Sequence, residues 1–415
     1  MTDPLDLPTL GYYNIFFSSC QASEKGNCGK TKEVRCFLCD WNLSFLIDSV
    51  HSLWYTVKKF KMNRIFTYDF GGYMLRWNCD YLEGAHPKIL ERLIATNEEQ
   101  TVGYGMDEYT ASAKEKIKAA CECENGEVYF LVGGTQTNAT VLSTLLKNCE
   151  GVLAADTGHV SVHEAGAIEY TGHKVITIPA VNGKVCPKKA RAYLANFYKD
   201  IAWAHMVRPG AIYISHPSEY GTLYSAEELA ELRAICDEYE MKLFLDGARL
   251  GFGLAAEHTD VTLPVIAQYC DAFYIGGTKV GALFGEAVVF PKKADAKYFF
   301  TEVKQHGALL AKGRLLGLQF DALFTDNLYM EISRKAVGQA MKIRRALVEK
   351  GIALYFDSYT NQQFFVFSDE LLSRVSEKVA VDDWGVIDED GNHAIRITTS
   401  WATTDEAVDY LISLF

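Results

Sequence analysis

The sequence predicts an α/β fold: a large domain built on a mostly parallel sheet, followed by a smaller C-terminal α+β domain. Short apolar runs alternate with helical stretches from about residue 85 to residue 290. This alternation is typical of a parallel sheet covered by helices on both faces. The pattern then changes to a long helical region, roughly 318–350, and three further apolar runs, which indicates a separate α+β unit. The 415 residues are 49% hydrophobic, enough for a sizeable core.

The expected strands are short apolar runs. They lie at 127–132, 151–155, 174–179, 211–215, 242–246 and 272–276 in the large domain and at 352–356, 363–367 and 394–400 in the small one. Apolar residues at helical spacing predict helices at 86–100, 139–148, 225–240 and 318–350. Ser225 and Glu228 have the spacing of a capping box at the start of the third helix.

Residues 1–61 differ from the rest of the chain and show no sustained helix or strand period. They carry four of the eleven cysteines, but a second pair to complete a zinc site with Cys36 and Cys39 is missing. The apolar segment 41–57 is a weak membrane span because Asp48 and His51 interrupt it. We expect a dispensable extension, with Met62 as the start of the folded domain.

The chain is therefore expected to have four parts. These are an extension of unknown role (1–61), for which disorder is one reading, a segment that contributes to the small domain and the active site (62–100), a large cofactor-binding domain (101–315) and a small domain (316–415).

Charge and cysteine usage limit the partners. The net charge of −12 and a pI near 5.4 argue against nucleic acid and anionic membranes, which require basic patches. Most cysteines stand singly in apolar segments, as expected for core residues in a reducing compartment. We expect a cytoplasmic protein without a disulfide framework.

A candidate phosphate site follows the strand at 127–132, where small and polar residues lead into a helix. Free N–H groups and the helix dipole at such a turn attract anions. The residues involved are Gly133, Gly134, Thr135, Thr137 and Asn138. Alone the signal is weak, because many strand-to-helix turns contain glycine for geometry only.

Asp246 directly follows a predicted strand, at the edge where ligands gather in open α/β sheets. Arg249 comes three residues later. One reading is a mutual salt bridge or a helix cap. The other is a carboxylate aimed at a cationic ring nitrogen, beside an arginine that grips a substrate carboxylate.

Lys279 is the only charged residue from Ala272 to Phe284. Its stem could be buried with the head in water, or its amine could be kept neutral to form a Schiff base. A phosphate turn, an aspartate at a strand end and an isolated lysine together suit pyridoxal 5′-phosphate, whose phosphate, ring nitrogen and aldehyde need these three groups. No metal site is expected.

Two histidines follow predicted strands and should face the same edge. His159 could stack on the cofactor ring or move protons, and His163 competes with it for either role. His216 follows the strand at 211–215 and is expected to point toward the crevice.

Five motifs, in this order, resemble the low-specificity L-threonine aldolases: GGTQTN, DTGHVSVHEAGA, FLDGARL, GGTKVGALFGEAVV and AIRITTSWATT. This family belongs to the β-eliminating lyase group of fold-type I pyridoxal-phosphate enzymes, and the resemblance covers about 62–415. It implies a fold-type I, transferase-like large domain in which His159 stacks on the ring, Asp246 binds the pyridine nitrogen and Lys279 forms the Schiff base.

The resemblance also implies that Arg249 and Arg396 hold the substrate α-carboxylate and that His216 acts near the β-hydroxyl. Arg314 resembles an arginine that reaches a partner subunit's phosphate, since such enzymes are dimers or tetramers. The segment 102–110 corresponds to a loop near a subunit boundary.

Two segments that bear on side-chain specificity depart from the family pattern. Asn78, Cys79 and Asp80 stand where many members have a Ser-Asp-Thr stretch of the substrate pocket, which makes Asn78 a candidate substrate contact. The loop ISHPSEYG replaces a common Asn-Thr-His form.

The expected reaction is cleavage of L-threonine or L-allo-threonine to glycine and acetaldehyde. The alternative is a pyridoxal-phosphate lyase that eliminates a β-substituent from another amino acid and yields pyruvate and ammonia. A non-catalytic carrier of the cofactor is disfavoured, because the lysine, the aspartate, both arginines and the histidine are all present.

Overall fold

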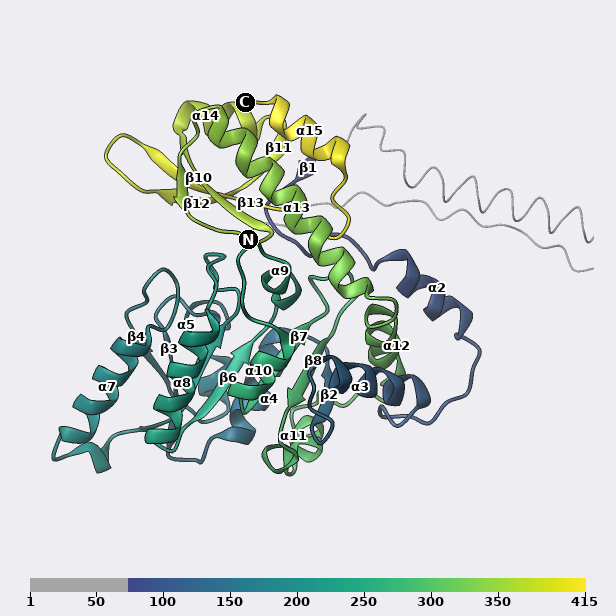
Figure 1. Cartoon of the computed structure of the whole chain (residues 1–415), viewed down its shortest axis with the longest axis vertical. Helices are drawn as coiled ribbons and strands as arrows, with labels where there is room; N and C mark the ends of the chain where they lie inside the picture. The colour runs from purple at the N-terminus through teal and green to yellow at the C-terminus, as the bar shows by residue number, and fades with distance from the viewer. Residues whose placement is uncertain (1–73) are drawn as a thin grey trace, which may run out of the picture. The chain divides into compact units, whose positions relative to one another are not determined.

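The computed structural model describes residues 74–415 of the chain. Figure 1 draws the preceding residues as a thin grey trace. The expected extension 1–61, its cysteine pair, the weak span at 41–57 and the start at Met62 lie outside the described residues.

A seven-stranded sheet forms the centre of the large domain, in the order β2-β8-β7-β6-β5-β3-β4. The pairs from β4 to β7 are parallel, whereas β8 runs antiparallel to β7 and β2. The strands are β2 (Glu127–Leu131), β3 (Glu150–Ala155), β4 (Val175–Ile178), β5 (Arg208–Ser215), β6 (Lys242–Asp246), β7 (Ala272–Gly276) and β8 (Glu286–Phe290). The mostly parallel sheet is confirmed, and β8 is an additional strand in the apolar run after Lys279.

Both faces of this sheet are buried, because alternate residues of each strand enter two separate cores. Leu243 and Leu245 of β6 lie in one core, and Phe244 between them lies in the other. The first core includes side chains of α7 (Pro187–Lys199), α8 (Ala226–Glu238) and α10 (Leu263–Tyr269). The second includes those of α4 (Gly134–Leu145), α6 (Ala167–Tyr170) and α11 (Phe299–Gln305). Helices on both faces are what the uninterrupted apolar strands predict.

The remaining helices of the large domain connect or flank these layers. They are α2 (Pro87–Ala95), α3 (Glu108–Ala120), α5 (His159–Val162), α9 (Leu250–Leu254) and the short 3₁₀ turns η1 (Trp203–His205) and η2 (Lys293–Ala296). The capping box of Ser225 and Glu228 is present at the start of α8.

The predicted helical region 318–350 consists of two helices. These are α12 (Arg314–Leu323) and α13 (Leu328–Glu349). Asp326 and Asn327 between them have φ values of 51° and 60°. A right-handed helix cannot pass through residues in this left-handed conformation, which Asp and Asn tolerate better than most.

The small domain contains an antiparallel sheet in the order β12-β13-β10-β9. Its strands are β9 (Leu354–Phe356), β10 (Gln362–Ser368), β12 (Asp382–Val386) and β13 (Asn392–Thr398). Side chains of α13, α14 (Asp369–Ser376) and α15 (Asp405–Ser413) share a core with β10 and β13. Figure 1 shows α13 extending from α12 to this sheet. A short parallel pair, β1 (Leu75–Arg76) with β11 (Val379–Ala380), ties the N-terminal segment to the small domain.

Among the helices of residues 74–415, none combines the length and the apolar character needed to cross a membrane.

Candidate active site

Two adjoining cavities lie where β3, β5, β6 and β7 end at their carboxyl edge. The inner one, of about 220 Å³, is lined by the turn after β2 and by the segments after β5, β6 and β7. The outer one, of about 830 Å³, also takes Asp382, Trp384 and Arg396 from the small domain. Side chains common to both cavities are His159, Glu219, Arg249 and Lys279. Ligands of open α/β sheets bind at this edge.

Lys279 lies in the turn after β7 and faces both cavities. Burial, and then the positive charge of Arg249, lowers the pKa of its amine. Its nitrogen is 5.9 Å from the centre of the Tyr81 ring, and no hydrogen-bond partner for it lies among the described residues. An amine with a lowered pKa that is free of partners is suited to nucleophilic attack on an aldehyde.

Asp246 ends β6 with its carboxylate buried and fully hydrogen-bonded. Its donors are Tyr274 Oη at 2.5 Å and Ala248 N at 3.0 Å to Oδ1, and Tyr213 Oη at 2.6 Å and Asn138 Nδ2 at 3.0 Å to Oδ2. Burial alone would raise the pKa of Asp246, but the charge of His159 and the tyrosine hydroxyls lower it below its usual value. The carboxylate therefore stays ionised and fixed in position. A salt bridge to Arg249, one of the two readings of the sequence, is absent among these contacts.

His159 begins α5 and lines both cavities. Its Nδ1 is 2.7 Å from Oε1 of buried Glu164. Burial lowers the pKa of the imidazole, but the Glu164 hydrogen bond and the charge of Asp246 outweigh it and raise the pKa. The His163 ring is centred 5.7 Å away and lines only the outer cavity.

The turn into α4 provides an open helix start at the inner cavity. Gly133, Gly134 and Thr135 line the cavity, and no side chain caps the helix. A Cβ on Gly133 would meet no atom within 4 Å, whereas one on Gly134 would lie 3.0 Å from the Tyr274 hydroxyl. The first N–H groups of α4 are thus available to an anion.

Asn138 does not serve this turn as expected. Its amide donates to Glu164 Oε1 at 2.7 Å and to Asp246, so the side chain holds two carboxylates instead of a phosphate. The Thr137 hydroxyl is buried without a partner among the described residues.

Both predicted carboxylate-binding arginines reach the cavities, but each already has an acidic partner. Nε and Nη2 of Arg249 donate to Asp80 at 2.7 and 3.0 Å. Nη2 of Arg396 lies 2.7 Å from Asp382, and its Nε is buried without a partner in the described part of the chain. No local pattern in the sequence marks Asp80 as the partner of Arg249, because the two residues are 169 positions apart.

Asn78, chosen instead of Asp80, does not line either cavity. Its carbonyl accepts from Arg396 Nη2 at 3.3 Å, and its side-chain Oδ1 is buried without a partner among residues 74–415. It therefore supports Arg396 through the backbone and is not placed to contact a substrate in the cavities.

His216 is a second correction. Ser215 at the end of β5 faces the inner cavity, and His216 points the other way because side chains alternate along a strand. Its ring is fully buried, and Nδ1 accepts from Tyr224 N at 3.3 Å. Burial lowers the pKa of His216 to about 4, so the ring is neutral.

Arg314 lies at the start of α12, outside both cavities. Its guanidinium donates to the carbonyls of Thr96 at 2.8 Å and Asn97 at 3.3 Å. A role for Arg314 in a partner's site stays a prediction.

Glu219 and Glu286 line the inner cavity and were both missed. Burial raises the pKa of Glu286 to about 8, and its carboxyl group accepts from Thr278 Oγ1 at 2.8 Å and Gly277 N at 3.2 Å. An acidic residue inside the apolar run 280–290 was a usable signal for Glu286. No comparable signal marks Glu219, which lies in a polar loop.

The inner cavity fits pyridoxal phosphate. A helix start lacking a cap can receive the phosphate, a buried ionised aspartate can face a cationic ring nitrogen, and an amine with a lowered pKa is free to react. These are the three groups that the cofactor requires of a protein.

Known proteins of similar sequence and fold agree with this reading. A threonine aldolase structure from Leishmania major is 38% identical, with a TM-score of 0.79 over 82% of this chain and 98% of that chain. A low specificity L-threonine aldolase of Pseudomonas sp. (strain NCIMB 10558) is 28% identical over 332 residues, or 79% of this chain and 93% of that protein. An aspartate aminotransferase of Thermus thermophilus, at 16% identity and a TM-score of 0.60, shares the fold.

The fold is therefore that of the fold-type I pyridoxal-phosphate enzymes. The sequence profile of one family, described as Beta-eliminating lyase, matches residues 80–369, more than half of the chain. The chain belongs to the beta-eliminating lyase family.

Proposed function

We propose that this protein is a pyridoxal-phosphate-dependent aldolase that cleaves L-threonine and L-allo-threonine to glycine and acetaldehyde. The observation that carries the proposal is the meeting of Lys279, Asp246 and the open start of α4 in one cavity, which adjoins two arginines. The names of the Leishmania and Pseudomonas relatives support the aldol reaction in particular.

Each residue has a distinct task in this proposal. Lys279 holds the cofactor, and Asp246, kept ionised by its four donors, holds a proton on the ring nitrogen. Arg396 and Arg249 orient the substrate carboxylate, and the His159 ring covers the cofactor. When bound, pyridoxal phosphate supplies a ring that accepts negative charge from the substrate Cα.

The alternative function is β-elimination from another amino acid, which the name of the family keeps open. The test is to supply the purified enzyme with threonine, allo-threonine, serine, cysteine and aromatic amino acids and to identify the products. Glycine with acetaldehyde is expected. Faster release of pyruvate and ammonia from any of these substrates would refute the aldolase proposal. Borohydride treatment should attach the cofactor to Lys279, and labelling of Lys292 or Lys293 would refute that assignment.

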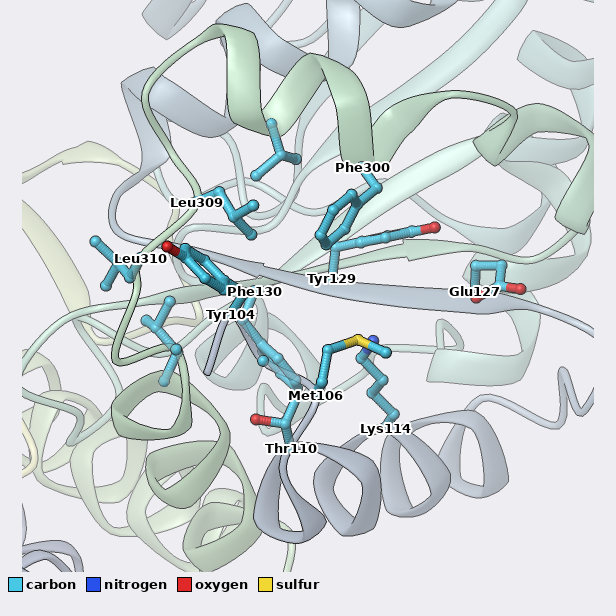
Figure 2. Close-up of a pocket in the computed structure, with 14 residues that line it drawn as sticks. Tyr104, Met106, Thr110, Lys114, Glu127, Tyr129, Phe130, Phe300, Leu309 and Leu310 are labelled. Carbon is cyan, nitrogen blue, oxygen red and sulfur yellow. The ribbon is translucent and has the colours of Figure 1, made fainter. Parts of the chain in front are cut away.

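We further propose that two copies associate through the face around residues 102–106. A cavity of about 380 Å³ lies here, and Figure 2 shows Tyr104, Met106, Tyr129 and Phe300 around it. Met106 is 69% exposed and Val102 67%, although both are apolar. Exposed apolar side chains grouped around a hollow are typical of protein interfaces. Replacing Met106 with Glu should lower the mass of the assembly measured by light scattering.

The expected parts 62–100, 101–315 and 316–415 and a cytoplasmic location belong to the same proposal. Limited proteolysis and fractionation of the cells that make the protein would test them.

A further inference from the structure

Glu219 holds a special position among the acidic residues of the site. It lies in the loop between β5 and α8 and, of the described carboxylates, is the one that lines both cavities. Lys279 and Arg249 line both cavities too, so the proposed reaction has to take place where the cavities meet. Glu219 faces this same junction.

One oxygen of Glu219 is not held by any other described residue. Oε1 accepts from Ser215 Oγ at 2.7 Å and from the His159 backbone N–H at 2.9 Å. No other residue among 74–415 donates to Oε2, and the remaining donor to the carboxylate is its own backbone N–H. The other two carboxylates of the inner cavity have donors on both oxygens: Asp246 has four donors and Glu286 has two. Asp156 and Asp382 line only the outer cavity, where Ala180 N donates to Asp156 Oδ1 and Arg396 and Trp384 hold Asp382 Oδ2.

The loop that carries Glu219 is held in place by its neighbours. Ser218 Oγ accepts from the backbone N–H groups of Thr222 at 3.2 Å and Tyr220 at 3.3 Å. Gly221 has a φ of 69°, and a Cβ there would overlap the side chain of Ser358. A fixed loop gives the carboxylate the constant position that proton transfer needs.

The electrostatic surroundings favour a base. Burial raises the pKa of Glu219, and the negative charge of Asp246 on β6 adds to this effect. His159 on α5 donates to it from its backbone N–H, and the Arg249 guanidinium and the Lys279 amine line the same junction. A raised pKa makes a carboxylate a stronger proton acceptor.

The histidines are weaker candidates for this step. His216 faces away from the cavities, and His159 has its Nδ1 held by Glu164 and a raised pKa that favours the protonated form. His163 lines only the outer cavity. The loop of Glu219 is also where the sequence departs from the Asn-Thr-His form of the resembling family.

We propose that Glu219 is the catalytic base that removes the β-hydroxyl proton of the substrate. This inference rests on the proposed aldolase function. The proton passes to Oε2, the O–H bonding pair becomes the second bond of the acetaldehyde carbonyl, and the Cα–Cβ pair stays on Cα. A proton then returns to Cα and gives glycine, so no further reactant is needed.

The test separates proton removal at the β-hydroxyl from the rest of the chemistry. Glu219→Gln keeps an oxygen for Ser215 and His159 but cannot accept the proton. Its kcat for threonine cleavage should fall by about 100-fold or more, the usual contribution of a general base, with little change in KM. Exchange of the glycine α-proton with D2O, followed by NMR, needs no β-hydroxyl and should stay near the wild-type rate. Glu231→Gln, at an exposed position of α8, is the matched control.

The pH dependence gives a second readout. The wild-type kcat/KM should fall as acid protonates Glu219, and the residual activity of Glu219→Gln should lack this decline. Cofactor loading of each variant is measured by its absorbance.

Three results would overturn the assignment. They are unchanged cleavage by Glu219→Gln, equal losses of cleavage and glycine exchange, or a selective loss of cleavage in His163→Gln instead. A wild-type enzyme that exchanges glycine but does not cleave threonine would overturn the aldolase proposal itself, which is a distinct outcome.

Discussion

Replacing Asp80 with Asn should destabilise the protein more than any other single change at the arginine pairs. The Asp80 side chain is fully buried and that of Arg249 is 14% exposed. Two hydrogen bonds join them, and Asn361 Nδ2 donates to Asp80 at 2.9 Å. An asparagine has nearly the same shape but leaves the Arg249 charge without compensation.

The expected cost follows from this burial. Removing one partner of a buried ion pair costs about 3–5 kcal/mol. For a folded part spanning residues 74–415, average unfolding entropies give about 0.7 kcal/mol per kelvin, so the thermal midpoint should fall by about 4–7 °C. Asp382→Asn is the matched control, because Asp382 is 32% exposed and its pair with Arg396 should contribute only about 0–1 kcal/mol.

Calorimetry of the cofactor-loaded protein measures the thermal midpoints of the Asp80→Asn and Asp382→Asn variants. The Arg249→Met variant and the Asp80→Asn/Arg249→Met double variant complete a double-mutant cycle. Burial would raise the pKa of Asp80, but Arg249 and Lys279 hold it below its usual 3.8. The stabilisation is therefore present above pH 4 and lost as the pH falls through the lower, folded-state pKa. A shift for Asp80→Asn no larger than that for Asp382→Asn would refute the reasoning.

Two further predictions concern the site, and a third concerns the buried His216 behind it. Asp246→Asn should retain the cofactor but lose about 10- to 100-fold in kcat, the equivalent of a charge-assisted hydrogen bond of about 1.5–3 kcal/mol; near-normal turnover would exclude the role. Arg396→Lys keeps the charge but loses the planar fork, so KM for threonine should rise several-fold in steady-state kinetics, and unchanged KM in both Arg396→Lys and Arg396→Ala would contradict a carboxylate contact. Burial holds the pKa of His216 near 4 against 6.5 when unfolded, so stability should fall by about 3 kcal/mol as the pH drops from 6.5 to 4; denaturant titrations of His216→Gln should lack this loss.

The sequence predicted the parts of the site that depend on local pattern. Lys279 interrupts an apolar run and Asp246 ends an apolar strand. Both can be recognised in one sequence without homologues, because charged residues are rare in buried segments. Ligands of open α/β sheets bind at the carboxyl ends of the strands, which predicted that both residues lie at one edge of the sheet, and they do.

Predictions from strand ends failed where the position of a side chain depends on a shift of one residue along the strand or on a contact with a distant part of the chain. His216 follows Ser215 by a single position, and that step reverses the direction of its side chain. Asp80 meets Arg249 across 169 residues and Asn361 across 281, so no local pattern could reveal the contact. The break between α12 and α13 depends on two residues in the left-handed conformation, which the spacing of apolar residues does not reveal.

The paired arginines have a consequence for substrate recognition. Arg249 and Arg396 are already paired with Asp80 and Asp382. The free energy of binding a substrate carboxylate is therefore only the difference between its new contacts with the arginines and the existing contacts that it weakens or displaces. The Asp382 pair is partly exposed and can yield at small cost, whereas the Asp80 pair is buried and cannot. Arg396 is therefore the arginine that can move toward a substrate, and Arg249 is the fixed one. Since Arg396 lies on β13 and Arg249 follows β6, binding of a carboxylate by both would draw the small domain toward the large one.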